Sequence, residues 1–223
     1  MPRLNDAEEV AAHLQQYPNS KWGFAIYRCT YDSAADWTRF LQILHSRVEK
    51  SLDYYNRRDL LARLDWAVQD DPTTLDGASK DFVRAHFRSW ARTAAAGEGT
   101  PHHASPRYTY CVHVDAAALD SVVNEAPQPP SPDLGGVGYV NVVNAEWEMP
   151  DRETFDYDAS GLDPGEDDPT DEGEEEFEGC RLFDVGWMRV CVDGLLPRVW
   201  VLLSPGHSGW DVNYVRPPQI TIP

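Results

Sequence analysis

The chain has 223 residues, of which 42% are hydrophobic, 11% aromatic and 25% charged. That composition supplies a sizeable core and excludes a disordered, collagen-like or coiled-coil chain. The 37 acidic and 19 basic residues give a formal net charge of -18, which repels phosphate backbones, so we expect no nucleic-acid partner. The four cysteines form no Cys-x-x-Cys pair and are too few for a disulfide scaffold, which favours free thiols in a reducing compartment.

The first twenty residues contain no apolar run long enough for the core of a signal peptide. No stretch of the chain approaches the roughly 18 consecutive apolar residues of a membrane-spanning helix. We therefore expect a cytoplasmic protein without a membrane partner. It would consist of a polar N-terminal segment at residues 1–20 and a single α+β domain at residues 21–223.

The first part of the domain alternates strands with long helices. Residues 22–29 are aromatic and β-branched and predict a strand. Ser33 stands three residues before Asp36, a variant of the capping box, and opens a helix whose apolar residues recur at gaps of three and four until Tyr55. Residues 64–69 alternate apolar and polar side chains, which is typical of a half-buried strand.

A second amphipathic helix is predicted from Ser79 until two glycines, Gly97 and Gly99, end it. Its inner face is expected to carry Phe82, Val83, Phe87 and Trp90. Residues 107–115 predict a third strand, and Asp115 is placed to cap a short helix after it. A proline-rich loop then precedes a fourth strand, which is predicted at residues 137–147.

The C-terminal part is predicted as a short helix at residues 183–192 and two strands at residues 198–204 and 210–216, the last ended by Pro217. Residues 206–210 superficially resemble a nucleophile elbow, but they lack its final glycine, and we interpret them as a hairpin turn.

Residues 150–179 hold fourteen Asp or Glu and one Arg, so this block carries -13 of the formal net charge of -18. Its low apolar content predicts a solvated, mobile insertion in the domain.

The alternation of strands and helices favours an α+β fold. We expect a ferredoxin-like or related sandwich, in which helices cover one face of a mainly antiparallel sheet. No glycine-rich turn follows an early strand, which disfavours a nucleotide-binding Rossmann domain, and no cofactor is expected.

Several strings of this sequence resemble a group of hypothetical proteins from filamentous fungi. They are WGFAIYRCTYDSAADWTRFL, LDGASKDFVRAHFRSWA, RYTYCVHVDAAAL, GYVNVVNAEW, DVGWMRVCVDGLLPRVWVLLS and YVRPP. The resemblance covers most of the chain apart from the N-terminal tail, the proline-rich loop and the acidic block. It implies a fungal, cytosolic protein and supplies neither an activity nor a catalytic residue.

Candidate catalytic residues lie on the predicted strands. Because residues two apart on a strand point the same way, Cys111, His113 and Asp115 share one face of the third strand. On a face free of helices, we expect His113 to carry a proton with Asp65 or Glu146 as its partner. The substrate-binding candidates, which would hold an anionic or carbonyl group, are Arg28, Tyr110 and Arg216. The alternative is that these are ordinary solvent-facing residues of a sheet.

Metal binding is not expected, because His102 and His103 are adjacent on a flexible loop and no zinc-ligand spacing occurs. A calcium loop starting at Asp168 would place Thr170 at its third position and Gly179 where the bidentate Glu belongs, so it fails. The eight tryptophans fit core packing, although an aromatic-lined ligand cavity would use the same residues.

Two hypotheses about function follow. The first is a small-molecule-binding protein, extending to a cofactor-independent acid–base enzyme of isomerase, cyclase or hydrolase type. The second is an interaction module whose acidic insertion binds a basic protein partner. The sequence leaves the oligomeric state open.

Overall fold

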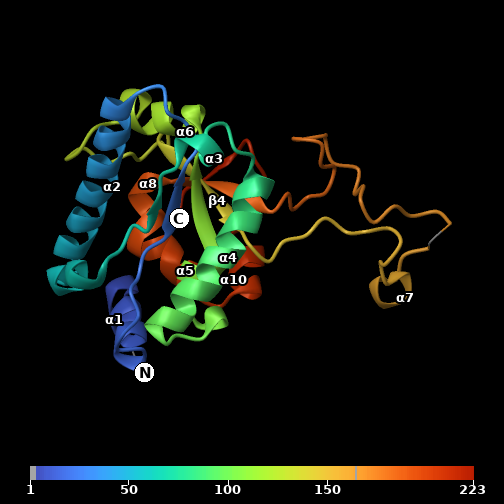
Figure 1. Cartoon of the computed structure of the whole chain (residues 1–223), viewed down its shortest axis with the longest axis horizontal. Coiled ribbons are helices and arrows are strands. Elements are labelled where there is room, and N and C mark those ends of the chain that lie inside the picture. Colours follow the sequence, from blue (N-terminus) through green and yellow to red (C-terminus); the bar gives the residue numbers. More distant parts are fainter. Residues whose placement is uncertain (1–3, 164) are drawn as a thin grey trace.

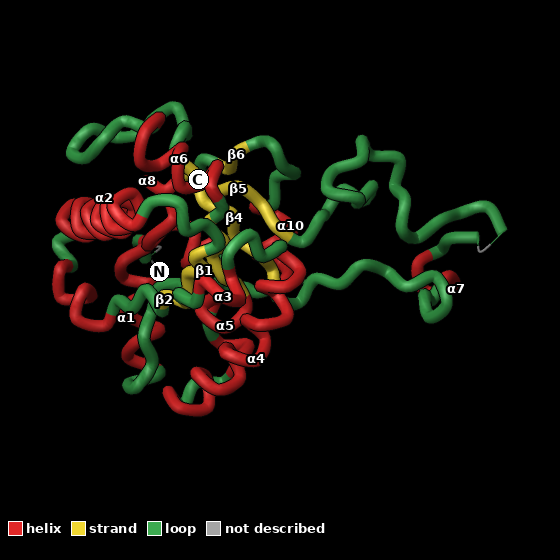
Figure 2. Tube along the Cα trace, turned by 45° about the horizontal axis from the view of Figure 1, so that its top comes forward, coloured by secondary structure: helices red, strands yellow, loops and turns green. Residues whose placement is uncertain are grey.

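The computed structural model describes residues 4–163 and 165–223 and shows a six-stranded sheet between two layers of helices (Figures 1 and 2). The strands lie in the order β2-β1-β3-β4-β5-β6. Their bounds are β1 Ala25–Arg28, β2 Val68–Gln69, β3 Tyr110–Val114, β4 Tyr139–Asn144, β5 Trp187–Cys191 and β6 Ile220–Thr221.

The sheet is mixed. β1 pairs in parallel with both β2 and β3, and β5 pairs in parallel with β6, whereas β4 is antiparallel to β3 and β5. The fold is therefore α+β in the broad sense predicted from the sequence. The ferredoxin-like arrangement is not confirmed, since three of the five strand pairings are parallel rather than antiparallel.

One face of the sheet packs against α2 (Ala34–Tyr54), which begins at its N-cap Ser33 as predicted. Its stripe of Phe40, Leu44 and Val48 joins Ile26 of β1 in one hydrophobic cluster. The same face is covered by further helices: α1 Asp6–Gln16, α6 Ala116–Asp120, η3 Ser121–Glu125, α8 Val192–Gly194, η4 Leu195–Val199, α9 Trp200–Leu202 and α10 His207–Asn213. Val10 and Leu14 of α1 are buried in this cluster, so the expected polar tail contributes to the core.

The opposite face packs against α4 (Lys80–Glu98), which runs from its N-cap Ser79 to Gly99 as predicted. Val83, Phe87 and Ala91 form a second cluster with residues of β1 and β3. The expectation that Phe82 also faces inward is wrong, because its side chain is exposed. The expectation of helices on one face only is wrong too. α2 and α4 each connect parallel strands, and they cross on opposite faces of the sheet.

The order of the first three strands reverses at β1. From β1 the chain passes through α2 to β2 on one side of β1, and then through α4 to β3 on the other side. The loops after β1 and β3 lead to α2 and α6 on one face, whereas α4, which precedes β3, lies on the opposite face. In open α/β sheets such a reversal leaves a crevice where ligands bind.

The C-terminal predictions are wrong in three places. Residues 183–192 contain strand β5 instead of a helix, residues 198–204 are mainly helical instead of a strand, and the segment 206–216 forms α10 instead of a hairpin turn and strand. β5 is buried on both faces, so it lacks the alternation that marks a half-buried strand.

Shorter elements complete the fold: η1 Arg58–Arg63, α3 Pro72–Leu75, η2 His102–Ala104, α5 Pro106–Thr109 and α7 Tyr157–Ser160. No helix in the described ranges combines the length and apolar composition that crossing a bilayer requires.

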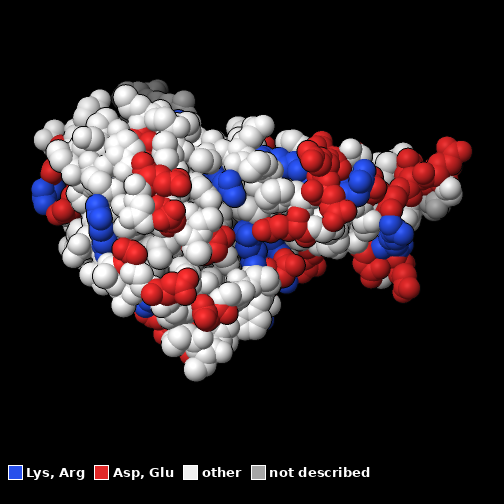
Figure 3. All heavy atoms as spheres, turned by 90° about the horizontal axis from the view of Figure 1, so that it is seen from above, with Lys and Arg blue, Asp and Glu red and all other residues white. Residues whose placement is uncertain are grey.

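The acidic block forms an arm that extends away from the sheet and its helices (Figures 1 and 2). Apart from α7 and a few bridges, its described residues have no regular secondary structure. Carboxylate side chains cover much of the arm in the space-filling view (Figure 3).

Candidate functional site

A cavity of about 560 Å³ lies on the α4 side of the reversal between β1 and β3. We call it the α4 pocket. It is lined by residues from the ends of β1 and β3, the start of α4, the segment after β4 and the end of the acidic block, namely Cys29, Gly77, Ala78, Ser79, Lys80, Asp81, His113, Asp115, Trp147, Met149, Phe177, Glu178, Gly179, Cys180, Val185 and Trp187.

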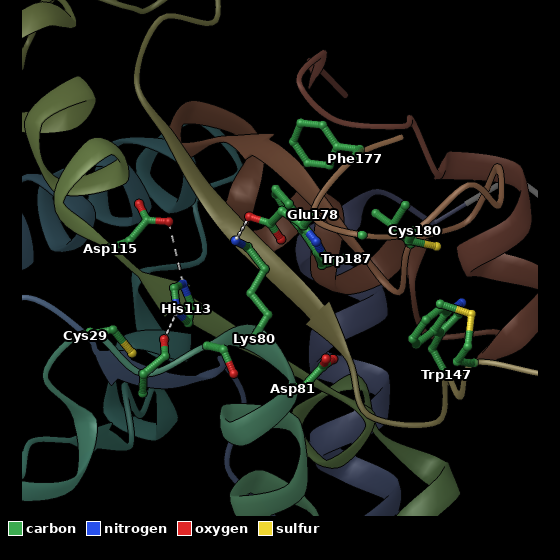
Figure 4. Close-up of a pocket in the computed structure, with 16 residues that line it drawn as sticks. Cys29, Lys80, Asp81, His113, Asp115, Trp147, Phe177, Glu178, Cys180 and Trp187 are labelled. Atoms are coloured by element: carbon green, nitrogen blue, oxygen red, sulfur yellow. Dashed lines mark hydrogen bonds and ion pairs between the residues drawn. The ribbon is translucent and has the colours of Figure 1, made fainter. Parts of the chain in front are cut away.

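His113 lies on the wall of this pocket (Figure 4) and is only 3% exposed. Its Nε2 is 2.9 Å from the carbonyl oxygen of Ala78, so this nitrogen carries the proton and donates it. Its Nδ1 lies 3.4 Å from Asn141 Nδ2, which also donates to Asp115 Oδ2 at 3.0 Å. Burial lowers the pKa of His113, which keeps the ring neutral with both nitrogens partnered.

Lys80, the first residue of α4, reaches across the pocket (Figure 4). Its Nζ lies 2.8 Å from Glu178 Oε1 and 4.0 Å from the ring centroid of Trp187. The ammonium therefore combines an ion pair with a cation–π contact. The Lys80 side chain is 11% exposed and that of Glu178 52% exposed, so the carboxylate is the accessible partner of the pair.

The end of the acidic block lies over Trp187. The ring of Phe177 packs against it with centroids 5.7 Å apart. Arg216 holds this segment by donating to the backbone oxygens of Glu175, Cys180 and Leu182 at 2.7, 3.2 and 3.1 Å. These bonds fix the position of Glu178 without using its carboxylate.

Carboxylates outnumber cations along the lining of the pocket. Asp81, Asp115 and Glu178 line it with one lysine, Lys80, and Asp81 also pairs with Arg84. Burial also raises the pKa of the Cys29 thiol to about 12, so it remains protonated and is no nucleophile at neutral pH. The pocket is therefore an aromatic and acidic surface.

The two predicted catalytic partners lie elsewhere. Asp65 pairs with Arg107 and Lys21 near the C-terminal end of α4, where Arg107 also contacts Glu98. Glu146 follows β4 and is exposed in a different depression. Their grouping with His113 was a wrong prediction, because it assumed that residues close to strand ends converge whatever the strand order.

None of the three predicted substrate-binding residues lines the α4 pocket. Arg28 contacts Thr30 O at 3.1 Å and Asp70 at 3.4 Å, with its guanidinium over Tyr31. The hydroxyl of Tyr110 donates to the carbonyl of Gly206 at 3.0 Å, in the cluster on the α2 face.

Arg216 does not line the α4 pocket, and it acts there only through the backbone that it holds. Of the six predicted site residues, the structure places His113 alone in the lining.

Sequence reasoning missed Lys80, Glu178 and Trp187. Lys80 was part of a helix start, Glu178 belonged to a block interpreted as solvent-exposed, and Trp187 lay in a predicted helix. The available signal was Phe177 and Cys180, an aromatic residue and a thiol that interrupt an otherwise polar run. Apolar residues inside such a run indicate a return to the folded surface.

Two other cavities among the described residues differ from the α4 pocket. On the α2 side of the reversal, a cavity of about 420 Å³ is lined by Ser33, small residues of α6 and several aspartates. A groove of about 700 Å³ between α1 and α10 is larger but holds neither a buried charged side chain nor a tryptophan. Within residues 4–163 and 165–223, no three His, Cys, Asp or Glu side chains are grouped as metal ligands.

Comparison with protein-family models, with curated proteins and with solved structures finds no match to this chain.

Proposed function

We propose that this protein binds a small organic molecule in the α4 pocket. The observation that carries the proposal is the position of the cavity at the carboxyl ends of β1 and β3, where the strand order reverses. Its volume of about 560 Å³ lies within the range of small-molecule sites, and aromatic side chains combined with a few charged groups are typical of them.

The geometry of His113 favours ligand binding over acid–base catalysis, the second part of the first hypothesis. A general base needs a free lone pair within reach of the ligand. In His113 one ring nitrogen donates to Ala78, and the other accepts from Asn141. We therefore propose binding, and we assign His113 the role of fixing the strand end against the start of α4.

The first test is to purify the full chain, denature it and examine the released small molecules by mass spectrometry, alongside a thermal-shift screen of metabolites. A bound ligand at about 100-fold its Kd is expected to raise the unfolding midpoint by roughly 5–10 °C. Met149→Trp, at the rim of the α4 pocket, should abolish this increase. Val212→Trp, in the groove beside α10, is the matched control and should leave it unchanged.

Two results would refute the proposal. One is that no molecule is released and no compound stabilises the chain. The other is that Val212→Trp removes the stabilisation while Met149→Trp preserves it, which would place the ligand in the groove between α1 and α10.

A second candidate function is that the acidic arm binds a basic protein partner. The supporting observation is the concentration of -13 charges in an arm that extends away from the body (Figure 3). A field of one sign accelerates association with a cationic surface and makes it salt-dependent.

The arm is tested by a variant in which six exposed carboxylates become amides, at Glu153, Asp156, Asp158, Asp163, Glu166 and Asp167. These positions spare Phe177 and Glu178, so the α4 pocket stays intact. We expect the original chain to retain basic proteins from a lysate at low salt and the amide variant to lose them. Equal retention by the two chains would show that the carboxylates of the arm do not bind the basic proteins.

Fungal origin and a cytoplasmic location stay predictions from the sequence. A fluorescent fusion expressed in a filamentous fungus would test the location, and exclusion of the fusion from the cytoplasm would contradict it.

A further inference from the structure

We propose that the ligand of the α4 pocket is a small alkylammonium cation, which replaces the ammonium of Lys80 between the ring of Trp187 and the carboxylate of Glu178. This inference rests on the proposed function and adds the chemical class of the ligand. It derives from the observation that one of the protein's own cations already occupies an aromatic and acidic site (Figure 4).

The Lys80 ammonium shows what this part of the pocket accepts. A cation within about 6 Å of a tryptophan centroid is attracted to the face of the ring. Here the distance is 4.0 Å, and Glu178 Oε1 is 2.8 Å away on the same ammonium. An organic cation of similar size would meet the same ring and the same carboxylate.

Charge around the pocket selects against anions. Asp81 and Asp115 line it together with Glu178, and the acidic arm begins and ends beside it. Displacement of Lys80 by another cation would preserve the local charge balance at Glu178. Asp81 pairs with Arg84, so an anionic ligand would bring its negative charge chiefly to Asp115 and Glu178.

Lys80 can move away from Glu178 because its side chain is a flexible four-carbon stem. Solvent reaches the carboxylate of the pair and screens the attraction between the two charges. Glu178 is half-exposed, whereas its backbone is held through the bonds of Arg216 to neighbouring residues. The carboxylate would therefore remain in position after the lysine has moved.

The test is a titration of the full chain, labelled with ¹⁵N, in which the indole N–H signal of Trp187 is followed by NMR. Trp187→Phe assigns the signal. The probes are choline and its neutral isostere 3,3-dimethylbutan-1-ol, with sodium chloride keeping the ionic strength constant. We expect a saturable shift of the Trp187 signal with choline and none with the alcohol.

Substitutions then distinguish replacement of Lys80 from binding beside it. Lys80→Met keeps the apolar stem but removes the competing ammonium, so choline should bind about 10-fold more tightly. Glu178→Gln should weaken it about 10-fold by removing the carboxylate. Lys50→Met, at an exposed position of α2 on the other face of the sheet, is the matched control and should change nothing.

Equal shifts with choline and the alcohol would overturn the inference, as would weaker choline binding by Lys80→Met. A shift of Trp187 with benzoate but not with choline would also overturn it, while the proposal of a small-molecule site would stand. If choline, the alcohol and benzoate all leave the Trp187 signal unshifted, and no molecule is released on denaturation, both the alkylammonium ligand and the small-molecule site are refuted.

Discussion

His13 is a residue whose protonation is coupled to folding. Its ring lies 5.1 Å from the ring centroids of both Tyr17 and Trp200. Burial and the neighbouring Arg63 lower its pKa from 6.5 to about 4. Between these two values the unfolded chain binds a proton at His13 that the folded chain does not bind. The free energy of unfolding should therefore decrease as the pH falls from about 6.5 to about 4.

Urea unfolding at pH 7 and at pH 4.5 measures this effect. The loss of stability between the two pH values should be smaller in His13→Gln than in the original chain. His45→Gln removes an exposed histidine of α2 and should leave the loss as it is. An unchanged pH dependence in His13→Gln would contradict the assignment.

Arg107 is a buried cation with a structural role. Its guanidinium donates to the backbone oxygen of Asp65 at 3.0 Å, contacts the carboxylates of Asp65 and Glu98, and lies 5.3 Å from the ring of Trp90. Arg107→Met would leave both carboxylates without this partner. We expect the free energy of unfolding to fall by about 3 kcal/mol.

The matched control for Arg107 is Arg58, an exposed arginine that pairs with Glu49 and Asp53. Arg58→Met should cost less than about 1 kcal/mol, because exposed ion pairs are screened by water. Equal losses in urea unfolding would show that burial does not distinguish the two arginines.

At the candidate site, the sequence predicts which face of a strand a residue occupies better than it predicts contacts between residues of different elements. His113 was found because strand alternation places it on one face of the third strand with Cys111 and Asp115. Its proposed partners Asp65 and Glu146 were wrong because pairing across a sheet depends on strand order. The pair of Lys80 and Glu178 joins positions 98 residues apart, and no local pattern predicts such a contact.

At the scale of elements, the helices with caps and long apolar stripes were predictable. Ser33 caps α2 as predicted, and Ser79, near which the second helix was predicted to begin, caps α4. The C-terminal helices were not predictable in this way. Residues 199–203 are apolar at every position, which hides the helical spacing of their buried members, Val199, Trp200 and Leu203. Periodicity cannot separate a buried strand from a buried helix in so short a run.

Alanine substitutions at the two glycines near the end of α4 are expected to change stability in opposite directions. Gly97 lies inside the helix with open space around it, whereas Gly99 is the C-cap with φ +61°. Gly97→Ala should stabilise the protein by about 0.5–1 kcal/mol through helix propensity. Gly99→Ala should destabilise it by about 1 kcal/mol, because a Cβ is strained in the left-handed conformation.

Thermal or urea unfolding of the two single variants checks the signs. A destabilising Gly97→Ala or a neutral Gly99→Ala would mean that α4 ends at a different residue from the one that the structure shows.

At the scale of the whole molecule, the arm holds most of the charge and little of the core. The six exposed carboxylates of the amide variant belong to neither hydrophobic cluster. Their conversion to amides removes six negative charges from a net of -18. It should nevertheless change the free energy of unfolding by less than about 1 kcal/mol. A larger change in urea unfolding would show that the arm contributes to folding.

The two chain segments that flank the acidic arm are hydrogen-bonded to each other. Trp147 Nε1 donates to the carbonyl of Asp184 at 3.1 Å, so the chain leaves and returns at almost the same place. The entropic free-energy cost of closing such a loop grows slowly, by about 0.6 kcal/mol for each doubling of its length. The arm is thus an insertion point. A reporter domain spliced in after Gly161 would leave the sheet, both helix layers and the α4 pocket free to assemble as a single cooperative unit.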